Sequence, residues 1–516
     1  MIRTAPVILE FHFTIGNLIM QTKQKITFII LIVLIGLCQR VSALTPADFE
    51  LNGISYRFSE DGQSLIVCKS ITGYKGEVTV PSTVLHNGKS YPVSEIDIYA
   101  FADCDELKSV SLKCKIKEIP KNCFERSHNL ETVELPKGIE CIRYEAFKNS
   151  GLRDVYLPDG LKEIEGHVFD GTNVERVVIP STVTALGDWN FYKCQQLQSL
   201  IIPGSIVRLL SHTIRACKRL KKIELGEGLV FLDDAFYECD SLESLDIPST
   251  VKHIGYRYSY RLQRISVDSG NKWYDSRNDC NALIETATNK LILGCINTVI
   301  PENVTSIGGA FRACEGLKTA LIPANVESID GAAFDENQLD SVIIQDGNKL
   351  IQLYWNTFTA YLPDGAYSTA KYLYMGRNAS NYNRPAFESF PNLETIIIGE
   401  SVDSLMMEGC KHDVSVYAKS MSPSHFDFSF GDDTEAVFES ATLYVPKGTR
   451  ELYMATEGWN RFLNIVEYEA TGISSVRSAS DSKAIYNING HRLASPQKGI
   501  NIIRNNDGTI RKEFVK

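Results

Sequence analysis

The sequence predicts a repeat solenoid, a right-handed coil in which short units stack side by side. One observation is a unit that returns about every 22 or 23 residues and is clearest in FYECDSLESLDIPSTVKHI, residues 236–254. A second is the alternation of apolar and polar residues before a proline in each unit, which is typical of a strand with one buried face. Self-similarity at such a period is the signature of stacked repeat proteins.

The first 43 residues are expected to be an export signal rather than part of the fold. Lys23 and Lys25 precede an apolar run at residues 26–37, and a small-residue site ends at Ala43. A basic end, a short apolar run and such a site are typical of a secretory signal peptide. The apolar run is too short for a stable transmembrane helix. We therefore expect an exported protein without an integral membrane span.

Three residues decide how this signal is interpreted. Met20 is the expected start of the signal, because residues 1–19 would make an unusual beginning. Cys38 raises the alternative of a lipid-anchored export signal. Leu37 stands where such a signal needs a small residue, so cleavage is the favoured interpretation. The expected location is the cell surface or the extracellular medium, with outer-membrane association as a further option.

Residues 44–98 are expected to form a β-rich N-terminal cap. They lack the full repeat but contain short strand-like runs and the turn pairs Asp61-Gly62 and Asn87-Gly88. Without a cap, the first unit of a solenoid would expose its core to water.

The solenoid itself is predicted over residues 99–468. Each unit begins at a large apolar anchor, continues into a short helical turn or irregular segment, and then enters a strand that ends at proline. Stacking places successive strands parallel and about 4.8 Å apart in one sheet on one face of the coil. The first eight anchors are Phe101, Phe124, Phe147, Phe169, Phe191, Ile214, Phe236 and Tyr258.

Two segments interrupt the period, and the array has a distinct end. Residues 268–297 are predicted to be a strand hairpin, and residues 345–386 an irregular section rich in Tyr and Gly. Trp459 and Phe462 are expected to cover the last turn of the coil.

A linker and a small β-module are predicted beyond the array. Residues 469–481 are small and polar without periodicity, which is typical of a linker. Residues 482–516 contain three or four short strand-like runs separated by turn residues such as Asp507-Gly508.

The repeated unit resembles that of the BspA-like leucine-rich repeat family of bacterial surface proteins. The shared pattern is Ala-Phe-x-x-Cys-x-x-Leu-x-x-Val-x-Leu-Pro-x-x-Val-x-x-Ile, as in residues 235–254, and the resemblance covers roughly residues 78–466. It implies a secreted or surface protein, often adhesive toward host proteins or neighbouring cells, without enzyme activity or fixed binding residues. Residues 486–516 resemble a type IX secretion sorting domain; a plain structural end-domain is the alternative.

Composition and motifs argue against catalysis and nucleic-acid binding. The formal net charge is -10, whereas a nucleic-acid binder concentrates Lys and Arg on one face. The sequence has no GxSxG, GxGxxG, P-loop or HExxH motif, and no two of its nine histidines are spaced as a helical metal pair. We therefore expect no catalytic residue, cofactor or metal site. An enzyme embedded in residues 345–386 is the outside alternative.

The thirteen cysteines would normally indicate disulfides in an exported protein. Several lie three residues after an anchor, however, where a repeat position forms a buried shelf and a free Cys acts as a small hydrophobe. Cys280 and Cys295 lie outside this register. They are the best disulfide candidates, with free thiols as the alternative.

The outward face of the predicted strands carries the candidate binding site. Tyr156, Val178 and Ile201 occupy the same outward position on adjacent strands, and Arg176 and Lys222 flank them. Exposed apolar patches rimmed by charge often mark partner sites. The alternative is that β-branched residues favour strands on either face. Our hypothesis is that this strip contacts the partner.

The expected function is therefore adhesin-like. A secreted or cell-surface solenoid would present a concave parallel sheet to a macromolecular partner, a host extracellular or cell-surface protein or a glycan, without catalysis. One alternative is a carbohydrate-binding surface module, for which clustered aromatic residues within 354–382 are the place to look. Another is a structural cell-envelope spacer with no favoured face.

Overall fold

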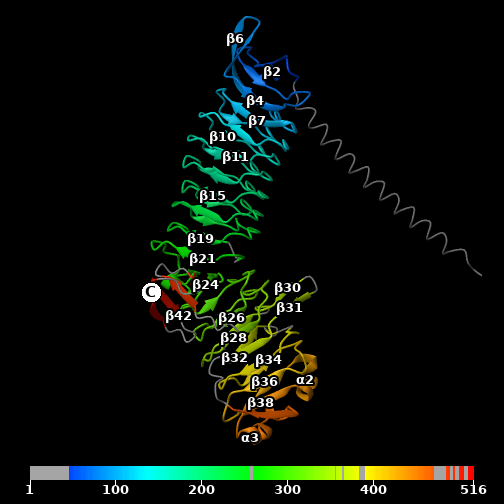
Figure 1. The fold of residues 1–516 in the computed structure, drawn as a ribbon, viewed down its shortest axis with the longest axis vertical. Helices are drawn as coiled ribbons and strands as arrows, with labels where there is room; N and C mark the ends of the chain where they lie inside the picture. The colour runs from blue at the N-terminus through cyan, green and yellow to red at the C-terminus, as the bar shows by residue number, and fades with distance from the viewer. Residues whose placement is uncertain are drawn as a thin grey trace, which may run out of the picture.

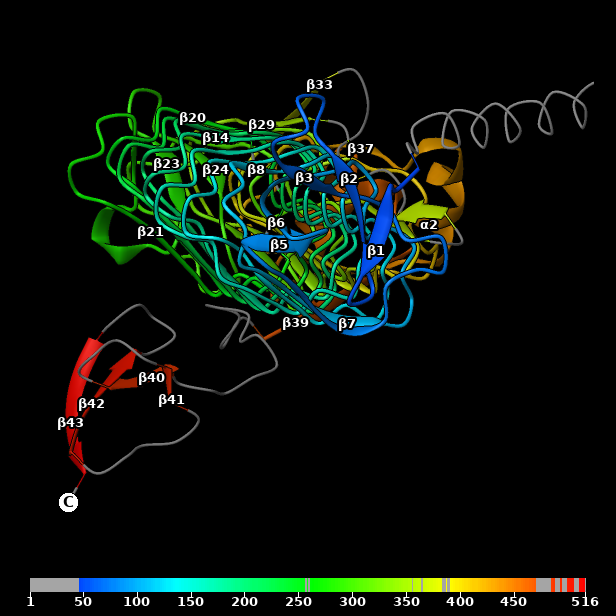
Figure 2. The same cartoon turned by 90° about the horizontal axis from the view of Figure 1, so that it is seen from above.

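The computed structural model describes residues 46–255, 258, 260–354, 356–362, 365–382, 387 and 390–469, and the backbone of four strands between residues 484 and 515. The repeats form one elongated coil in which strands of successive turns lie side by side (Figure 1). Seen from above, the turns superimpose around a common interior (Figure 2). The predicted β-rich solenoid is confirmed. The expected export signal, and all of the expected linker except Glu469, lie outside the described residues.

A five-stranded sheet precedes the coil. In spatial order its strands are β1 (Phe49–Leu51), β2 (Ile54–Phe58), β3 (Leu65–Val67), β6 (Lys89–Ile96) and β5 (Thr83–His86). A sixth strand, β4 (Gly76–Val80), pairs in parallel with the first strand of the array. The Tyr74 ring lies 4.6 Å from the first anchor ring, that of Phe101. This segment thus covers the start of the coil, where a cap is needed.

Each repeat adds one strand to a front ladder, which we define as β4 and the strands that follow it in parallel on the same side of the coil. Its first two sheets comprise β4, β7 (Leu107–Leu112), β9 (Thr132–Glu134) and β11 (Asp154–Val155), then β13 (Arg176–Val178), β15 (Ser199–Ile202) and β17 (Lys222–Leu225). Its last two comprise β19 (Ser244–Ile247) and β21 (Arg264–Val267), then β26 (Thr319–Ile322), β28 (Ser341–Ile344), β32 (Tyr372–Met375), β34 (Thr395–Ile398), β36 (Ser415–Ala418), β38 (Thr442–Pro446) and β39 (Asn464–Tyr468).

The apolar pair that follows each proline turn lies in a second, short strand. These strands form another parallel ladder, which we call the back ladder. Its first two sheets comprise β8 (Glu118–Ile119), β10 (Cys141–Ile142), β12 (Glu163–Ile164) and β14 (Ala185–Leu186), then β16 (Arg208–Leu209), β18 (Phe231–Leu232) and β20 (His253–Ile254). The third comprises β22 (Tyr274–Asp275), β23 (Leu283–Glu285), β24 (Lys290–Leu293), β25 (Ser306–Ile307), β27 (Ser328–Ile329), β29 (Ile351–Tyr354) and β33 (Ala379–Tyr382).

The two interruptions of the period contribute to these ladders. β22, β23 and β24 pair antiparallel around the short 3-10 helix η1 (Arg277–Asp279), and β24 then pairs in parallel with β25. The hairpin therefore begins the third back sheet rather than standing apart from the coil. Within residues 345–386, β29, β32 and β33 continue both ladders, with a small hairpin of β30 (Ala360–Leu362) and β31 (Gly365–Tyr367) between them. The connections between the strands are longer in this section, so the repeat period is not apparent in the sequence.

The segments around the anchors are turns rather than helices. Trp189 and Lys193, on either side of Phe191, have positive φ angles of 54° and 57°. This backbone directs the N–H of Phe191 to Thr213 O at 2.7 Å and that of Lys193 to Arg215 O at 3.0 Å in the next coil. The left-handed region is unfavourable for residues with a Cβ, so these inter-coil hydrogen bonds hold the turn in place.

The first five anchor rings form a continuous stack in the interior. The centroids of Phe101, Phe124 and Phe147 are separated by 5.1 Å at each step, with nearly parallel planes. The stack continues to Phe169 and Phe191 at 5.8 and 5.4 Å. These rings are fully buried, and offset aromatic stacking adds to the free energy gained by burying them.

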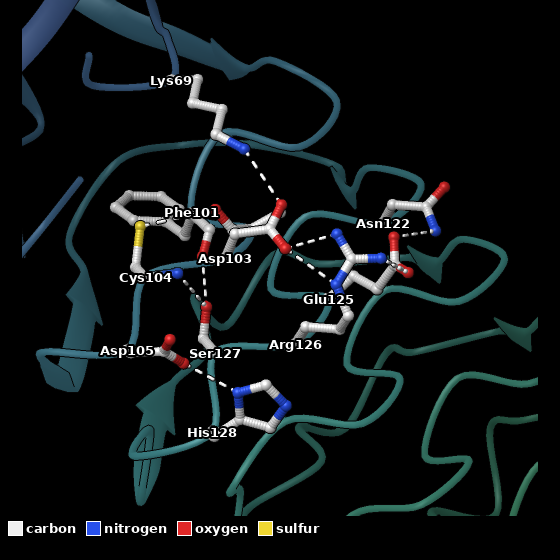
Figure 3. A network of polar contacts seen from close by, with 11 residues as sticks. Lys69, Phe101, Asp103, Cys104, Asp105, Asn122, Glu125, Arg126, Ser127 and His128 are labelled. Carbon is white, nitrogen blue, oxygen red and sulfur yellow. Dashed lines mark hydrogen bonds and ion pairs between the residues drawn. The ribbon is translucent and has the colours of Figure 1, made fainter. Parts of the chain in front are cut away.

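At several positions three residues after an anchor, the side chain donates a hydrogen bond to the coil before. Ser127 Oγ donates to the Phe101 carbonyl at 2.5 Å and accepts the N–H of Cys104 (Figure 3). Cys217 Sγ donates in the same way to Phe191 O at 2.9 Å. Each donor satisfies a carbonyl in the preceding coil, so the thiols here are more than small hydrophobes. Ion pairs such as that between Arg126 and Asp103 join coils nearer the surface (Figure 3).

All twelve cysteines in the described part of the chain are buried free thiols, Cys280 and Cys295 included. The disulfide considered for these two residues is therefore not formed in this structure. Burial raises the pKa of both thiols, so they stay protonated and poorly reactive.

One buried arginine replaces a repeated hydrogen-bond cap at the proline turns. Asparagines serve this purpose at two other turns: Asn271 Nδ2 donates to Pro248 O and Val251 O, and Asn325 Nδ2 donates to Pro301 O and Val304 O in the coil before. Arg377, with 1% of its surface exposed, instead donates to three carbonyl groups two coils back. These belong to Pro323 (2.9 Å), Ala324 (2.7 Å) and Val326 (2.7 Å).

The C-terminal end of the coil is closed by aromatic side chains. Trp459 and Phe462 are each 3% exposed and pack on Phe428, as their predicted covering role requires. The surrounding elements are β35 (Ser404–Met406), β37 (Asp427–Ser429), η2 (Gly431–Asp433), α2 (Thr434–Ser440), α3 (Arg450–Ala455) and η3 (Trp459–Arg461). Beyond them, β40 (Ala484–Asn487), β41 (Arg492–Leu493), β42 (Gly499–Arg504) and β43 (Ile510–Val515) form a separate antiparallel sheet. Within the described residues, no helix has the length and apolarity to cross a membrane.

Candidate partner-binding site

The strand register places the predicted apolar strip on the outward side of the front ladder. Val178 lies directly opposite Ile201, which in turn lies opposite Glu224. Tyr156 and Val178 are strongly exposed, at 75% and 59%, whereas Ile201 is half-buried. The outward alternation read from the sequence therefore holds at these positions.

The strip crosses a break in the ladder. β11 ends one sheet, and β13 begins the next. One backbone hydrogen bond, from Glu175 N–H to Arg153 O at 3.4 Å, joins the two coils beside this break. Tyr156 and Val178 thus stand on opposite sides of an interruption, while Val178 and Ile201 sit on continuously paired strands.

A hollow of about 840 Å³ lies over this break, on the outward side of β4, β7, β9, β11 and β13. Tyr156, Val178 and Arg176 line it together. Ile201 and Lys222 are not among its lining residues. The structure therefore brings three of the five predicted residues together and leaves two on the neighbouring strands. Its volume is in the range of ligand pockets, and its open shape suits a protruding side chain or loop.

The charges around the hollow are mostly negative. Its lining includes the carboxylates of Glu77, Glu134, Asp154 and Asp159, and one cation, Arg176. Lys113 and Ser111 donate hydrogen bonds to Glu134, which lower the pKa of that carboxyl. The Arg176 guanidinium is exposed and forms no ion pair with any described residue.

Lys222 differs from its expected role as a flanking cation. Its ammonium lies 2.6 Å from Glu224 on the same strand, and this hydrogen bond raises the pKa of Lys222. The pair is exposed, and the two charges of the pair nearly cancel. The positive edge of the strip therefore consists of Arg176.

A second outward column, which the sequence reading did not single out, follows the last front sheet. From β26 to β39 its members are Leu321, Ile343, Tyr374, Ile397, Tyr417, Tyr444 and Val466. Tyr417 and Tyr444 stack at 4.5 Å with planes 10° apart, so their faces are turned toward each other. The Tyr374 hydroxyl donates to Asp346 at 2.7 Å. The alternation of apolar and polar residues that predicted the first strip is also present in these strands, so the same sequence signal would have found this column.

One group of side chains in the described residues has the spacing of metal ligands. Cys141, Glu163 and Glu165 lie on the back ladder within ligand distance of one another. Arg143 binds Glu165 at 2.8 Å, and burial raises the pKa of Cys141 to about 12. A protonated thiol beside an engaged carboxylate is a poor metal site, since metal binding requires the thiolate.

Comparison with known proteins identifies the repeats. The sequence model of one protein family, described as the BspA type leucine rich repeat region, matches the chain in six copies, over residues 89–198, 141–265 and 293–411. No curated protein matches the chain.

Solved structures are similar to this chain. A leucine-rich repeat protein of T. pallidum is 28% identical over 39% of this chain and 90% of its own, with a TM-score of 0.32. One from Bacteroides ovatus is 18% identical over 82% of this chain and all of its own, with a TM-score of 0.44. The pneumococcal vaccine antigen PcpA is 17% identical over the same shares, with a TM-score of 0.37. Since the family model matches more than half of the residues, the chain belongs to the BspA type leucine-rich repeat family.

Proposed function

We propose that this protein is exported to the cell surface or medium and binds a macromolecular partner, as an adhesin does, through the front ladder. The observation that carries the proposal is the hollow at the β11–β13 break, which is lined by the exposed Tyr156 and Val178 and by Arg176, a cation without an ion-pair partner among the described residues. A family of repeat scaffolds supports a protein-interaction role.

The side chains at this hollow suit recognition of a folded protein. Tyr and Arg are enriched among residues that dominate binding energy, because each offers a large contact area and a polar tip. The ladder is preformed, so little conformational entropy is lost on binding. Lys113 pairs with Glu134, and the other three carboxylates around the hollow, which form no ion pair with a described residue, favour a partner with basic residues at its rim. The expected partner is a host extracellular or cell-surface protein.

The proposal also assigns roles to the segments before and after the coil. Residues 1–43 would act as the signal peptide, and residues 482–516 as a sorting or end module, with the four strands β40–β43 as its core. The alternative of a carbohydrate-binding module gains some support from the tyrosines of the second column, although stacked rings offer their edges rather than their faces.

The test is a binding screen of the full chain against extracellular-matrix proteins, mucins and polysaccharides. With a protein hit, the double change Tyr156→Ser and Val178→Ser should weaken binding by about tenfold to hundredfold, and Tyr156→Ser with Ile201→Ser by less. Leu85→Ser is the matched control, since Leu85 is 67% exposed in the N-terminal sheet. Binding unaffected by the double change would contradict the site. Saturable glycan binding would favour the carbohydrate-binding module. Binding to no member of the panel would favour the structural cell-envelope spacer.

A further inference from the structure

The front ladder is interrupted again between β17 and β19 and between β21 and β26, and a crevice with apolar walls lies at the last of these breaks. β21 ends one sheet, and β26 begins the seven-stranded one. The coil between them passes through residues 295–302 without forming a strand. Figure 1 shows β21 and β26 on either side of this interruption.

A crevice of about 760 Å³ opens between this coil and β26. Ile296 and Val299 line one wall, and Leu321 lines the other; all three are exposed, Leu321 by 47%. The floor reaches the buried anchor rings of Phe311 and Phe334, which stack at 5.1 Å. The crevice is therefore an open, apolar slot that leads from the surface to the core.

The backbone along one wall has an unused hydrogen-bonding edge. Ser341 N–H bonds to Lys318 O, and Gln345 N–H bonds to Ile322 O, so the peptide groups of the even-numbered residues face β28. Because a strand alternates its bonding side, the N–H and C=O groups of Thr319 and Leu321 face the crevice.

The opposite wall does not pair with this edge. The N–H of Ile296 bonds back to Leu262 O at 3.4 Å, and that of Val299 to Cys280 O at 3.0 Å. Among the described residues, no backbone hydrogen bond joins the stretch 295–302 to β26. In an ordinary coil of this ladder that bond is made, for example from Gln198 to Glu175.

The chemistry of the slot specifies an occupant. A free strand edge beside apolar walls is suited to an extended polypeptide, whose main chain pairs with the edge while alternate side chains enter the slot. The crevice lining carries one charge, the exposed carboxylate of Glu302, which forms no ion pair with any described residue. Charge complementarity then requires a Lys or Arg at one end of the segment.

We propose that this crevice binds an extended segment of a partner protein as an added strand beside β26. The segment carries apolar side chains at alternate positions and a basic residue next to Glu302. This surface lies several coils from the hollow at Tyr156, so it is a second, independent binding site. A partner with a folded body and a flexible arm could occupy both.

The test selects peptides from a displayed random library on the full chain and measures their binding by fluorescence anisotropy. The expected peptides alternate apolar and polar residues and contain Lys or Arg at one end. Leu321→Glu should weaken their binding by about 30-fold or more, as for a central contact, and Glu302→Gln should weaken binding of the peptides with the basic end. Leu85→Glu, an exposed leucine elsewhere, is the matched control.

Two further measurements separate strand addition from other contacts. N-methylation of the peptide amides that would face β26 should abolish binding, whereas methylation of the other amides should not. Bound peptide should slow hydrogen exchange in the segment that contains Thr319 and Leu321. Val299→Glu, on the opposite wall, provides a second variant if Leu321→Glu fails to fold.

Several outcomes would overturn the proposal. The selection could enrich no peptide, or peptide binding could be unchanged in both Leu321→Glu and Val299→Glu. Peptide binding could also be unaffected by N-methylation of the amides that would face β26. A dimer of the full chain that Leu321→Glu dissociates would instead assign the crevice to a second copy. Polysaccharide binding lost in the same variant would assign it to a glycan.

Discussion

Replacement of Arg377 tests whether a buried cation holds together coils that are not neighbours. Its guanidinium is almost completely buried and donates three hydrogen bonds to carbonyl groups of the 323–326 turn. Its Nε has no hydrogen-bond partner among the described residues. Gly347, in the coil between, leaves room for the side chain, because a Cβ there would lie 3.2 Å from Arg377 Cδ.

The magnitude follows from those three bonds. Each hydrogen bond to a charged group contributes about 1.5–3 kcal/mol, against a desolvation cost of several kcal/mol for the cation. Burial lowers the pKa of Arg377, which reflects that cost. For Arg377→Met, which leaves three carbonyl groups without their donor, we expect a loss of about 3 kcal/mol in the free energy of unfolding. Arg377→Lys keeps the charge but not the planar fork, and should lose about 2 kcal/mol.

Urea denaturation of the full chain measures this loss, with hydrogen exchange over residues 319–330 as a local readout. Both are needed because repeat arrays can unfold in parts. Arg153→Met is the control: Arg153 is exposed, and the change should stay within about 0.5 kcal/mol. If Arg377→Met were as stable as the unaltered chain, desolvation would cancel the three bonds and the argument would be refuted.

Three smaller perturbations test other contacts. Cys217→Ser keeps the donor to Phe191 O and should remain more stable by about 1 kcal/mol than Cys217→Val, as urea midpoints would show. Gly204→Ala places a Cβ 1.6 Å from Glu227 O, so the two coils must separate and the melting temperature should fall. Two lysines that hydrogen-bond to Glu140 lower its pKa from 4.5 to about 2. Because the folded pKa is the lower one, their contribution is complete above pH 4.5 and disappears toward pH 2. Glu140→Gln should flatten that part of a stability–pH profile.

The control for Gly204→Ala is a glycine after the strand of an earlier repeat. Gly138→Ala adds a Cβ with no atom within 4 Å and should leave the melting temperature nearly unchanged. An equal effect of the two alanine changes would argue against the close contact of coils at Gly204. A stability–pH profile that Glu140→Gln leaves unaltered would assign the acid sensitivity to other carboxylates.

The repeat in the sequence was sufficient to predict the architecture. In a solenoid each unit packs on its own copies, so one local pattern of anchor, strand and proline specifies both the core and the strand register. The stack from Phe101 to Phe191 and the pairing of Val178 with Ile201 follow from that pattern. The same alternation placed Tyr156 on the outward face.

Deviations from the period were harder to predict, because insertions change the connections without changing the ladders. The hairpin 268–297 was recognised as strands, but its place at the start of a back sheet depends on the pairing of β24 with β25. The role of Arg377 was likewise invisible, since its partners lie more than fifty residues earlier.

The candidate sites show the same division. Periodicity determines which side chains point outward, because the pleat of a strand is a local property. Whether neighbouring coils close their hydrogen bonds is decided by the fit between turns of unequal length, and only the tertiary structure shows the breaks at β11–β13, β17–β19 and β21–β26. It also shows that Glu224 neutralises Lys222, whereas Arg176 forms no ion pair within the described part of the chain. Packing between coils, rather than the pattern within one coil, therefore determines where this surface is open to a partner.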